Sequence, residues 1–183
     1  MANPEFKEDL DVLDKLSVCL YRLGISLFSI GCLLAAALSY EGITLASVTS
    51  PFDQWIFWML LTSTVLTAAN IHVYDKTVRT VVMWSGWLAL LLVVTGFPTW
   101  VSLGFCFVVF SGIALKESFC FRVPGLKLIP VLLVIAVLCT ALNKLPVLVA
   151  LYTAVGGIMG FLSFKKWQMP LHFDIGIKAN YQI

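Results

Sequence analysis

The side chains best suited to metal binding or proton transfer fall in short segments of this 183-residue chain. Two pairs are spaced i, i+3, namely His72 with Asp75 and Glu117 with Cys120. On a helix, this spacing puts both members of a pair on one face. Imidazole, carboxylate and thiol groups bind metals and transfer protons. If the segments meet, they predict one site, whose candidate residues are His72, Tyr74, Asp75, Lys116, Glu117, Cys120 and Asp174.

The same residues also fit a structural interpretation. Charged groups gather where apolar helices reach water, and Asp75 and Glu117 have basic neighbours in Lys76, Arg79 and Lys116. The spacings match no established metalloenzyme pattern. Ion pairing, a bound ion or headgroup, and catalysis therefore all remain open, and the metal and cofactor content stays undetermined.

These segments lie at the ends of long apolar runs. Hydrophobic residues make up 60% of the chain and the mean hydropathy is +0.96, values that predict lipid rather than water as the solvent. The runs do not alternate in polarity, which favours helices over a barrel. We predict an all-α bundle of six transmembrane helices in a single membrane domain, with spans near 20–40, 54–73, 78–97, 99–115, 126–142 and 146–164.

The basic residues predict the orientation of these spans. Eleven of the twelve lysines and arginines fall on one side of the predicted membrane, and only Lys144 falls on the other. By the positive-inside bias, both termini and the tail at 165–183 are expected in the cytoplasm. Arg22 lies close enough to this edge to extend its side chain into water. Trp84 and Trp87 fall deeper and are expected to pack between helices.

The N-terminal segment 4–19 is predicted to form an amphipathic cytoplasmic helix, with Asn3 as its cap and Pro4 in its first turn. Phe6, Leu10 and Leu13 recur at helical spacing and predict an apolar stripe opposite an acidic face. The acidic face argues against binding to an anionic leaflet. The stripe either folds over the basic rim of its own bundle, which we favour, or docks a membrane or cytoplasmic protein partner.

Polar and small residues inside the spans carry two further predictions. Ser63, Thr67 and Asn70 share one narrow helix face and form a polar seam. The seam can line a solute path or hydrogen-bond neighbouring helices, and we favour the second interpretation. Gly156 and Gly160 form a G-x-x-x-G pair that allows close helix approach, more commonly within one bundle than between two chains.

Four segments resemble motifs of a known family. They are residues 21–24 (Tyr-Arg-Leu-Gly), 71–74 (Ile-His-Val-Tyr), 116–121 (Lys-Glu-Ser-Phe-Cys-Phe) and 174–178 (Asp-Ile-Gly-Ile-Lys). They are similar, in order, to the bacterial and cyanobacterial integral membrane family catalogued as domain of unknown function 2301. Ile177 departs from this family, which tends to carry an aspartate there. The resemblance implies a small multispan protein of the bacterial inner membrane and brings no established activity.

Three functions fit these features. A non-catalytic accessory, assembly or scaffold protein fits best, because no Asp, Glu, Lys or Arg lies in the middle of a span. The polar seam suits a small-solute or ion transporter, and the His/Glu/Cys residues suit a membrane enzyme with a site at the cytoplasmic face. The expected partners are the lipid bilayer and a protein bound through the N-terminal helix; no nucleic acid is expected.

Overall fold

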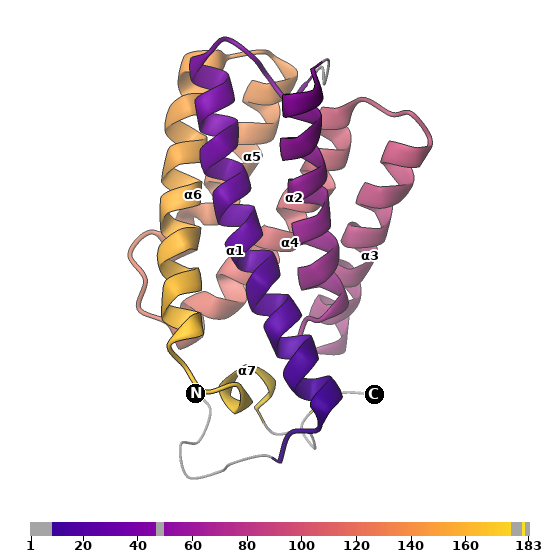
Figure 1. The fold of residues 1–183 in the computed structure, drawn as a ribbon, viewed down its shortest axis with the longest axis vertical. Coiled ribbons are helices and arrows are strands. Elements are labelled where there is room, and N and C mark those ends of the chain that lie inside the picture. Colours follow the sequence, from indigo (N-terminus) through magenta and orange to yellow (C-terminus); the bar gives the residue numbers. More distant parts are fainter. Residues whose placement is uncertain (1–8, 47–49, 177–180, 182–183) are drawn as a thin grey trace.

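The computed structural model describes residues 9–46, 50–176 and 181, and every regular element in this part of the chain is helical. The predicted cap at Asn3 and Pro4 lies outside these residues. The long helices lie side by side, with a short helix at one end of them (Figure 1). In order they are α1 (Val12–Tyr40), α2 (Pro51–Ala69), α3 (Lys76–Val94), α4 (Thr99–Cys120), a 3-10 turn η1 (Leu126–Leu128), α5 (Ile129–Ala141), α6 (Leu145–Trp167) and α7 (His172–Ile175).

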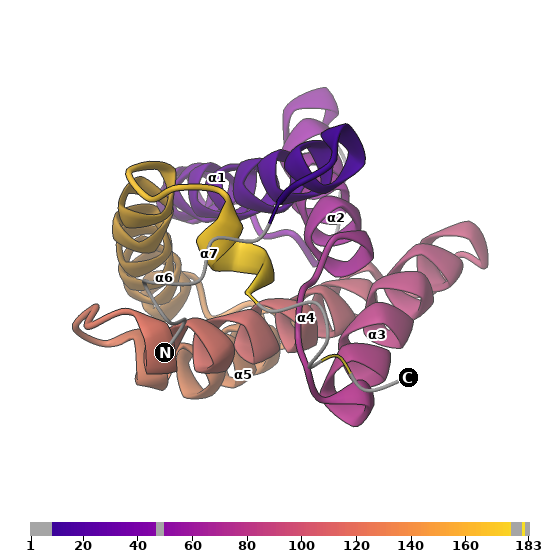
Figure 2. The same cartoon turned by 90° about the horizontal axis from the view of Figure 1, so that it is seen from below.

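The helices alternate in direction along the chain, as short connections require (Figure 1). The end view in Figure 2 places α1 between α6 and α2, its main packing partners, with α3 on the outside against α4. The four-residue α7 lies across one end of the bundle. We call this the basic end, because nine of the described basic side chains lie there: Lys15, Arg22, Lys76, Arg79, Lys116, Arg122, Lys127, Lys165 and Lys166.

Local sequence signals explain where the helices begin and end. Ser50 caps α2 by accepting a hydrogen bond from the Asp53 N–H at 3.3 Å, and Asp75 caps α3 by accepting one from the Val78 N–H at 2.8 Å. At the end of α3, Gly96 has a φ of 74°, which allows the next N–H, of Phe97, to reach the Leu92 carbonyl at 3.0 Å. The two caps mark where α2 and α3 begin, and Gly96 marks where α3 ends. The short connections that result let consecutive helices run in opposite directions.

The core of the bundle joins α1 to the helices around it. Phe28 of α1 stacks on Phe110 of α4, with ring centroids 3.5 Å apart and planes inclined by 10°. On the other side of α1, the Ser29 hydroxyl donates to the Gly156 carbonyl of α6 at 2.7 Å. A Cβ atom at Gly160 would lie 2.7 Å from Ser29 Oγ. The predicted use of Gly156 and Gly160 in an internal helix contact is therefore confirmed.

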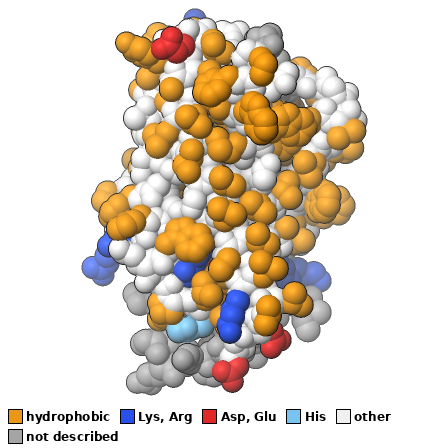
Figure 3. All heavy atoms as spheres, viewed as in Figure 1, with side chains coloured by type: hydrophobic (Ala, Val, Ile, Leu, Met, Phe, Trp, Pro, Cys, Tyr) orange, Lys and Arg blue, Asp and Glu red, His pale blue; other side chains and the backbone are white. Residues whose placement is uncertain are grey.

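Many large apolar side chains lie exposed on the outside of the bundle, and orange patches mark them along the face drawn in Figure 3. Trp84 and Trp87 are 63% and 62% exposed, so the prediction that they pack between helices is wrong. They lie on the exposed face of α3. Among the described residues, four helices are long and apolar enough to cross a membrane: Val12–Tyr40, Lys76–Val94, Thr99–Cys120 and Leu145–Trp167.

The N-terminal prediction needs correction. Residues 9–11 are not helical, and α1 begins at Val12 and runs without interruption into the first apolar run. No separate helix over 4–19 therefore exists in the described part of the chain. The described stripe residue Leu13 and its neighbour Leu16 are 77% and 53% exposed, so this part of the stripe is not buried against the basic rim.

Candidate functional site

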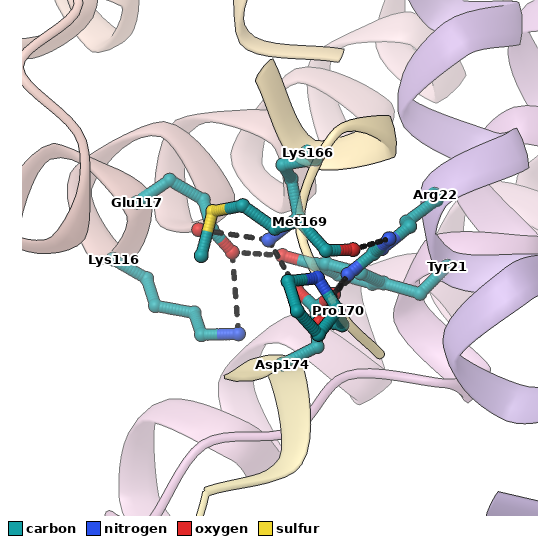
Figure 4. Close-up of polar contacts among 8 residues, drawn as sticks. All are labelled: Tyr21, Arg22, Lys116, Glu117, Lys166, Met169, Pro170 and Asp174. Atoms are coloured by element: carbon teal, nitrogen blue, oxygen red, sulfur yellow. Dashed lines mark hydrogen bonds and ion pairs between the residues drawn. The ribbon is translucent and has the colours of Figure 1, made fainter. Parts of the chain in front are cut away.

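The basic end holds a buried group of charged side chains centred on Asp174 of α7 (Figure 4). Arg22 Nε donates to Asp174 Oδ2 at 2.7 Å, and Lys166 Nζ pairs with Asp174 Oδ1. Arg22 also donates to the backbone carbonyls of Met169 and Pro170, at 2.8 and 3.1 Å. Arg22 and Lys166 are each only 2% exposed. The expectation that Arg22 extends into water is therefore wrong.

Glu117 is the second anion of this group. Its Oε1 accepts a 2.7 Å hydrogen bond from the Tyr21 hydroxyl and faces Lys116 Nζ at 3.3 Å, and its Oε2 pairs with Lys166 Nζ at 3.0 Å. Glu117 is 1% exposed. A buried carboxylate is stable only when such donors replace its water shell. Lys166 therefore bridges two anions, one on α4 and one on α7.

Four helices supply these residues, and we call the set Tyr21, Arg22, Lys116, Glu117, Lys166 and Asp174 the charge cluster. Tyr21 and Arg22 are adjacent on α1, Lys116 and Glu117 lie in the last turns of α4, and Lys166 lies near the end of α6. The chain after α6 passes over Arg22, which binds its carbonyls, and then returns as α7. The charge cluster thus ties the C-terminal segment to the end of the bundle.

A cavity of about 180 Å³ adjoins the charge cluster. Its lining combines charged groups with apolar and sulfur-containing side chains, so a ligand there would meet charges in a poorly hydrated setting. The cluster contains three cations and two carboxylates, a surplus of one positive charge. The lining residues are Lys116, Glu117, Cys120, Phe121, Lys166, Met169, Phe173 and Asp174.

The structure thus brings together four of the seven candidate residues, namely Lys116, Glu117, Cys120 and Asp174. Asp75 lies apart from them, exposed at the start of α3, where it serves as a helix cap. Tyr74 packs against the tail: its ring lies 5.0 Å from that of Tyr181, and its hydroxyl occupies the space where a Cβ of residue 176 would be.

His72 follows the end of α2 and is half-buried. Among the described residues, no hydrogen bond or ion pair joins it to Glu117 or Cys120, and its Nδ1 is buried without a hydrogen-bond partner. Burial, and secondly the charge of Lys116, lower the pKa of His72 from its ordinary value. Within the described part of the chain, no group of three or more His, Cys, Asp or Glu side chains is placed to hold a metal ion.

The candidate residues predicted from the sequence lack Tyr21, Arg22 and Lys166. The sequence predicts that both basic side chains are solvated, because a basic residue near a helix end usually reaches water. One feature of the sequence does point to these contacts. The segments 21–24, 116–121 and 174–178, which resemble motifs of the family, all contribute residues to the charge cluster. Motifs far apart in the sequence that carry opposite charges are candidates for mutual pairing.

The polar seam of α2 contributes to helix packing. The Ser63 hydroxyl donates to the Leu60 carbonyl at 2.6 Å, that of Thr67 to the Ser63 carbonyl at 2.8 Å, and the Asn70 amide to the Leu66 carbonyl at 2.8 Å. A Cβ at Gly24 of α1 would lie 2.6 Å from Thr67 Cγ2. These three hydrogen bonds thus run within α2 rather than to the neighbouring helices that the packing interpretation expects, while Ser63 and Thr67 lie directly against α1.

Comparison with known proteins agrees with this architecture. The family described as "Uncharacterized integral membrane protein (DUF2301)" matches residues 55–183, which hold Lys116, Glu117, Lys166 and Asp174. An "Uncharacterized protein" of Haemophilus influenzae is 33% identical over 184 residues and covers the whole of both chains. No solved structure matches. The chain belongs to the DUF2301 family of integral membrane proteins.

Proposed function

We propose that this chain is a six-span protein of the bacterial inner membrane, with both ends in the cytoplasm, that serves as a non-catalytic accessory or assembly protein. In addition to the four long apolar helices, α2 has 19 residues and is about 28 Å long at 1.5 Å per residue. Leu126–Ala141 is a shorter apolar helix. All six long helices run side by side (Figure 1), and the concentration of lysine and arginine at one end supports a cytoplasmic basic end.

The projecting start of α1 carries the proposal of a protein partner. Val12, Leu13 and Leu16 are 80%, 77% and 53% exposed. Val12 lies ten residues before the buried Arg22, which puts the start of α1 about 15 Å beyond it. Apolar side chains exposed together on a projecting helix are typical of an interaction surface.

Charge indicates the kind of partner. Asp11 and Asp14 flank this apolar surface, and Lys15 is its only basic neighbour in the same turns. An anionic leaflet favours helices rich in lysine and arginine. The surface instead suits an amphipathic helix of another protein that carries basic residues beside its apolar face.

Photo-crosslinking in living cells tests this proposal. A photoreactive amino acid replaces Leu13 in one variant and Tyr40 in the control; Tyr40 is 80% exposed at the opposite end of the same helix. We expect a discrete protein adduct from position 13 alone, which a second substitution, Leu16→Asp, abolishes. Adducts with lipid only, or equal protein adducts from both positions, would contradict the proposal.

A further inference from the structure

We propose that the cavity at the basic end binds a phosphate group through Lys116 and Lys166, independently of any protein partner. Both lysines line this cavity of about 180 Å³. Since one water occupies about 30 Å³ of liquid, the volume is equivalent to roughly six waters, enough for a phosphate group. Two sources share this chemistry, free phosphate and a phospholipid headgroup.

Unsatisfied charge is the first argument. The two carboxylates leave one positive charge of the charge cluster unbalanced. Lys116 makes the weakest contribution to the pairing, a single 3.3 Å contact, and its side chain is 21% exposed, whereas that of Lys166 is 3% exposed. Lys116 therefore carries the surplus charge on the side that a ligand can reach. A poorly hydrated surplus charge favours a bound counter-ion.

Unused donors are the second argument. Each ammonium group has three N–H donors. Lys166 uses two, on Glu117 and Asp174, and Lys116 uses at most one, on Glu117. Among the described residues, this leaves two donors of Lys116 and one of Lys166 without an oxygen acceptor, while both ammonium groups also lie 4.9 and 5.2 Å from the centroid of the Tyr21 ring. Because both lysines line the cavity, these donors are available to the oxygens of a phosphate group, which lysine binds as a point charge.

The neighbouring carboxylates are each paired with cations, which offsets their repulsion of such a ligand. Glu117 accepts from Tyr21 and pairs with two lysines, while Asp174 binds Arg22 and Lys166. The rest of the lining includes Phe121, Met169 and Phe173, which limit hydration around the lysines. The position of the cavity at the end of the bundle puts it within reach of both free phosphate and headgroups.

Two probes separate the sources. The full chain in neutral detergent is titrated with potassium phosphate, against potassium chloride of equal ionic strength. It is also placed in phosphatidylcholine nanodiscs with and without phosphatidic acid. The readouts are the melting temperature and the alkylation rate of Cys120, an exposed thiol in the cavity lining, with partly exposed Cys19 as internal reference. A response to phosphate identifies free phosphate, and a response to phosphatidic acid alone identifies a headgroup.

We expect the effective probe to raise the melting temperature by several degrees and to slow alkylation of Cys120 but not of Cys19. Lys116→Gln should weaken binding roughly tenfold or more, because it removes a charged hydrogen bond. Lys116→Arg should retain binding, as should the control Lys127→Gln, which changes an exposed lysine at the same end. If neither probe protects Cys120 of the wild-type chain, or if folded Lys116→Gln binds as the wild type does, the proposal is wrong. If Lys116→Gln does not fold, the protection of Cys120 in the wild-type chain still tests whether the cavity binds the probe.

Discussion

Arg22 of α1 and Asp174 of α7 form a buried ion pair although 152 residues separate them in the sequence. The pair joins the first helix to the short last one, and Lys166 of α6 binds the same carboxylate. Four residues are too few to form a stable helix by themselves, so α7 depends on these ion pairs and on the buried Ile175 for its position. This contact is the first target for mutation.

Asp174→Asn should destabilise the protein by about 3 kcal/mol, because it leaves Arg22 and Lys166 buried without a full counter-charge. The free energy of unfolding in mixed micelles with a denaturing detergent measures this loss. Glu41→Gln, at an exposed position beyond the other end of α1, is the matched control and should change little. The double variant with Arg22→Gln should be less unstable than the two single losses added together. Strict additivity would show that the ion pair does not couple these residues.

Tyr21→Phe tests the second anion. It removes the 2.7 Å hydrogen bond to the Glu117 carboxylate and should cost about 1.5–3 kcal/mol, the usual range for a bond to a charged group. Tyr152→Phe is a close comparison, since this buried tyrosine shares a 2.9 Å hydrogen bond with the neutral hydroxyl of Thr140. The same unfolding assay should rank the Tyr21 variant as the less stable. The reverse order would mean that the Tyr21–Glu117 bond adds little.

Gly156→Ala should destabilise the contact between α1 and α6. The new Cβ would lie 2.8 Å from Leu33 Cγ and 3.1 Å from the Ser29 carbonyl oxygen, so the Leu33 side chain or one of the two helices must shift, at a cost of about 1–3 kcal/mol. The neighbouring Gly157 is the control, because a Cβ there meets no atom within 4 Å. Gly157→Ala should be neutral or slightly stabilising, since alanine favours a helix. Equal thermal stability of both variants would argue against the close packing of α1 on α6.

The periodic and compositional features of the sequence predicted the helices well. These features are the continuous apolar runs, the Gly-Phe-Pro break at 96–98 and the small residues of α6. Each depends only on residues that are neighbours in the sequence, so a short stretch of sequence is enough to recognise it. The predicted runs at 99–115 and 146–164 correspond to α4 (Thr99–Cys120) and α6 (Leu145–Trp167), which continue past the predicted ends. Those extra turns carry Lys116, Glu117 and Lys166, the charged residues of the site.

Long-range pairing was not predictable in the same way. A lysine near a helix end looks the same whether it is solvated, as hydropathy suggests, or buried, as Lys166 is. A solvated and a buried lysine differ here only because the chain returns through α7 and brings Asp174 under α1 and α6. Likewise, Trp84 and Trp87 lie deep within the α3 sequence, but depth along a helix does not say which face meets lipid.

Acidification should destabilise the protein partly through His72. Burial and then the charge of Lys116 lower its folded pKa, while the Asn70 backbone and the charges of Asp174 and Asp14 act in the opposite direction. The unfolded chain therefore takes up a proton more readily, and stability falls as the pH drops below about 6.5 toward the folded pKa. His72→Gln should reduce the loss of melting temperature between about pH 7.5 and pH 5.5. An identical loss in both proteins would assign the pH dependence to other groups, such as the carboxylates.

Labelling with a membrane-impermeant maleimide in intact cells tests the orientation. Cys19, Cys120 and Cys139 are replaced by serine, while Cys32 and Cys106 are retained because they are fully buried. Single cysteines are then introduced at the exposed positions Glu41, Arg122, Lys144 and Gln168.

The two ends of the bundle should give opposite results. Cysteines at 41 and 144 lie beyond the end remote from the charge cluster and should react in intact cells, because the positive-inside bias places that end outside. Cysteines at 122 and 168, at the basic end, should react only after the membrane is permeabilised, which also controls for simple burial of the thiol. Labelling of position 122 in intact cells would mean that the basic end faces outside and that the proposed topology is wrong. Reaction of 122 and 144 from the same side would instead mean that α5, the shortest of the six long helices, does not cross the membrane.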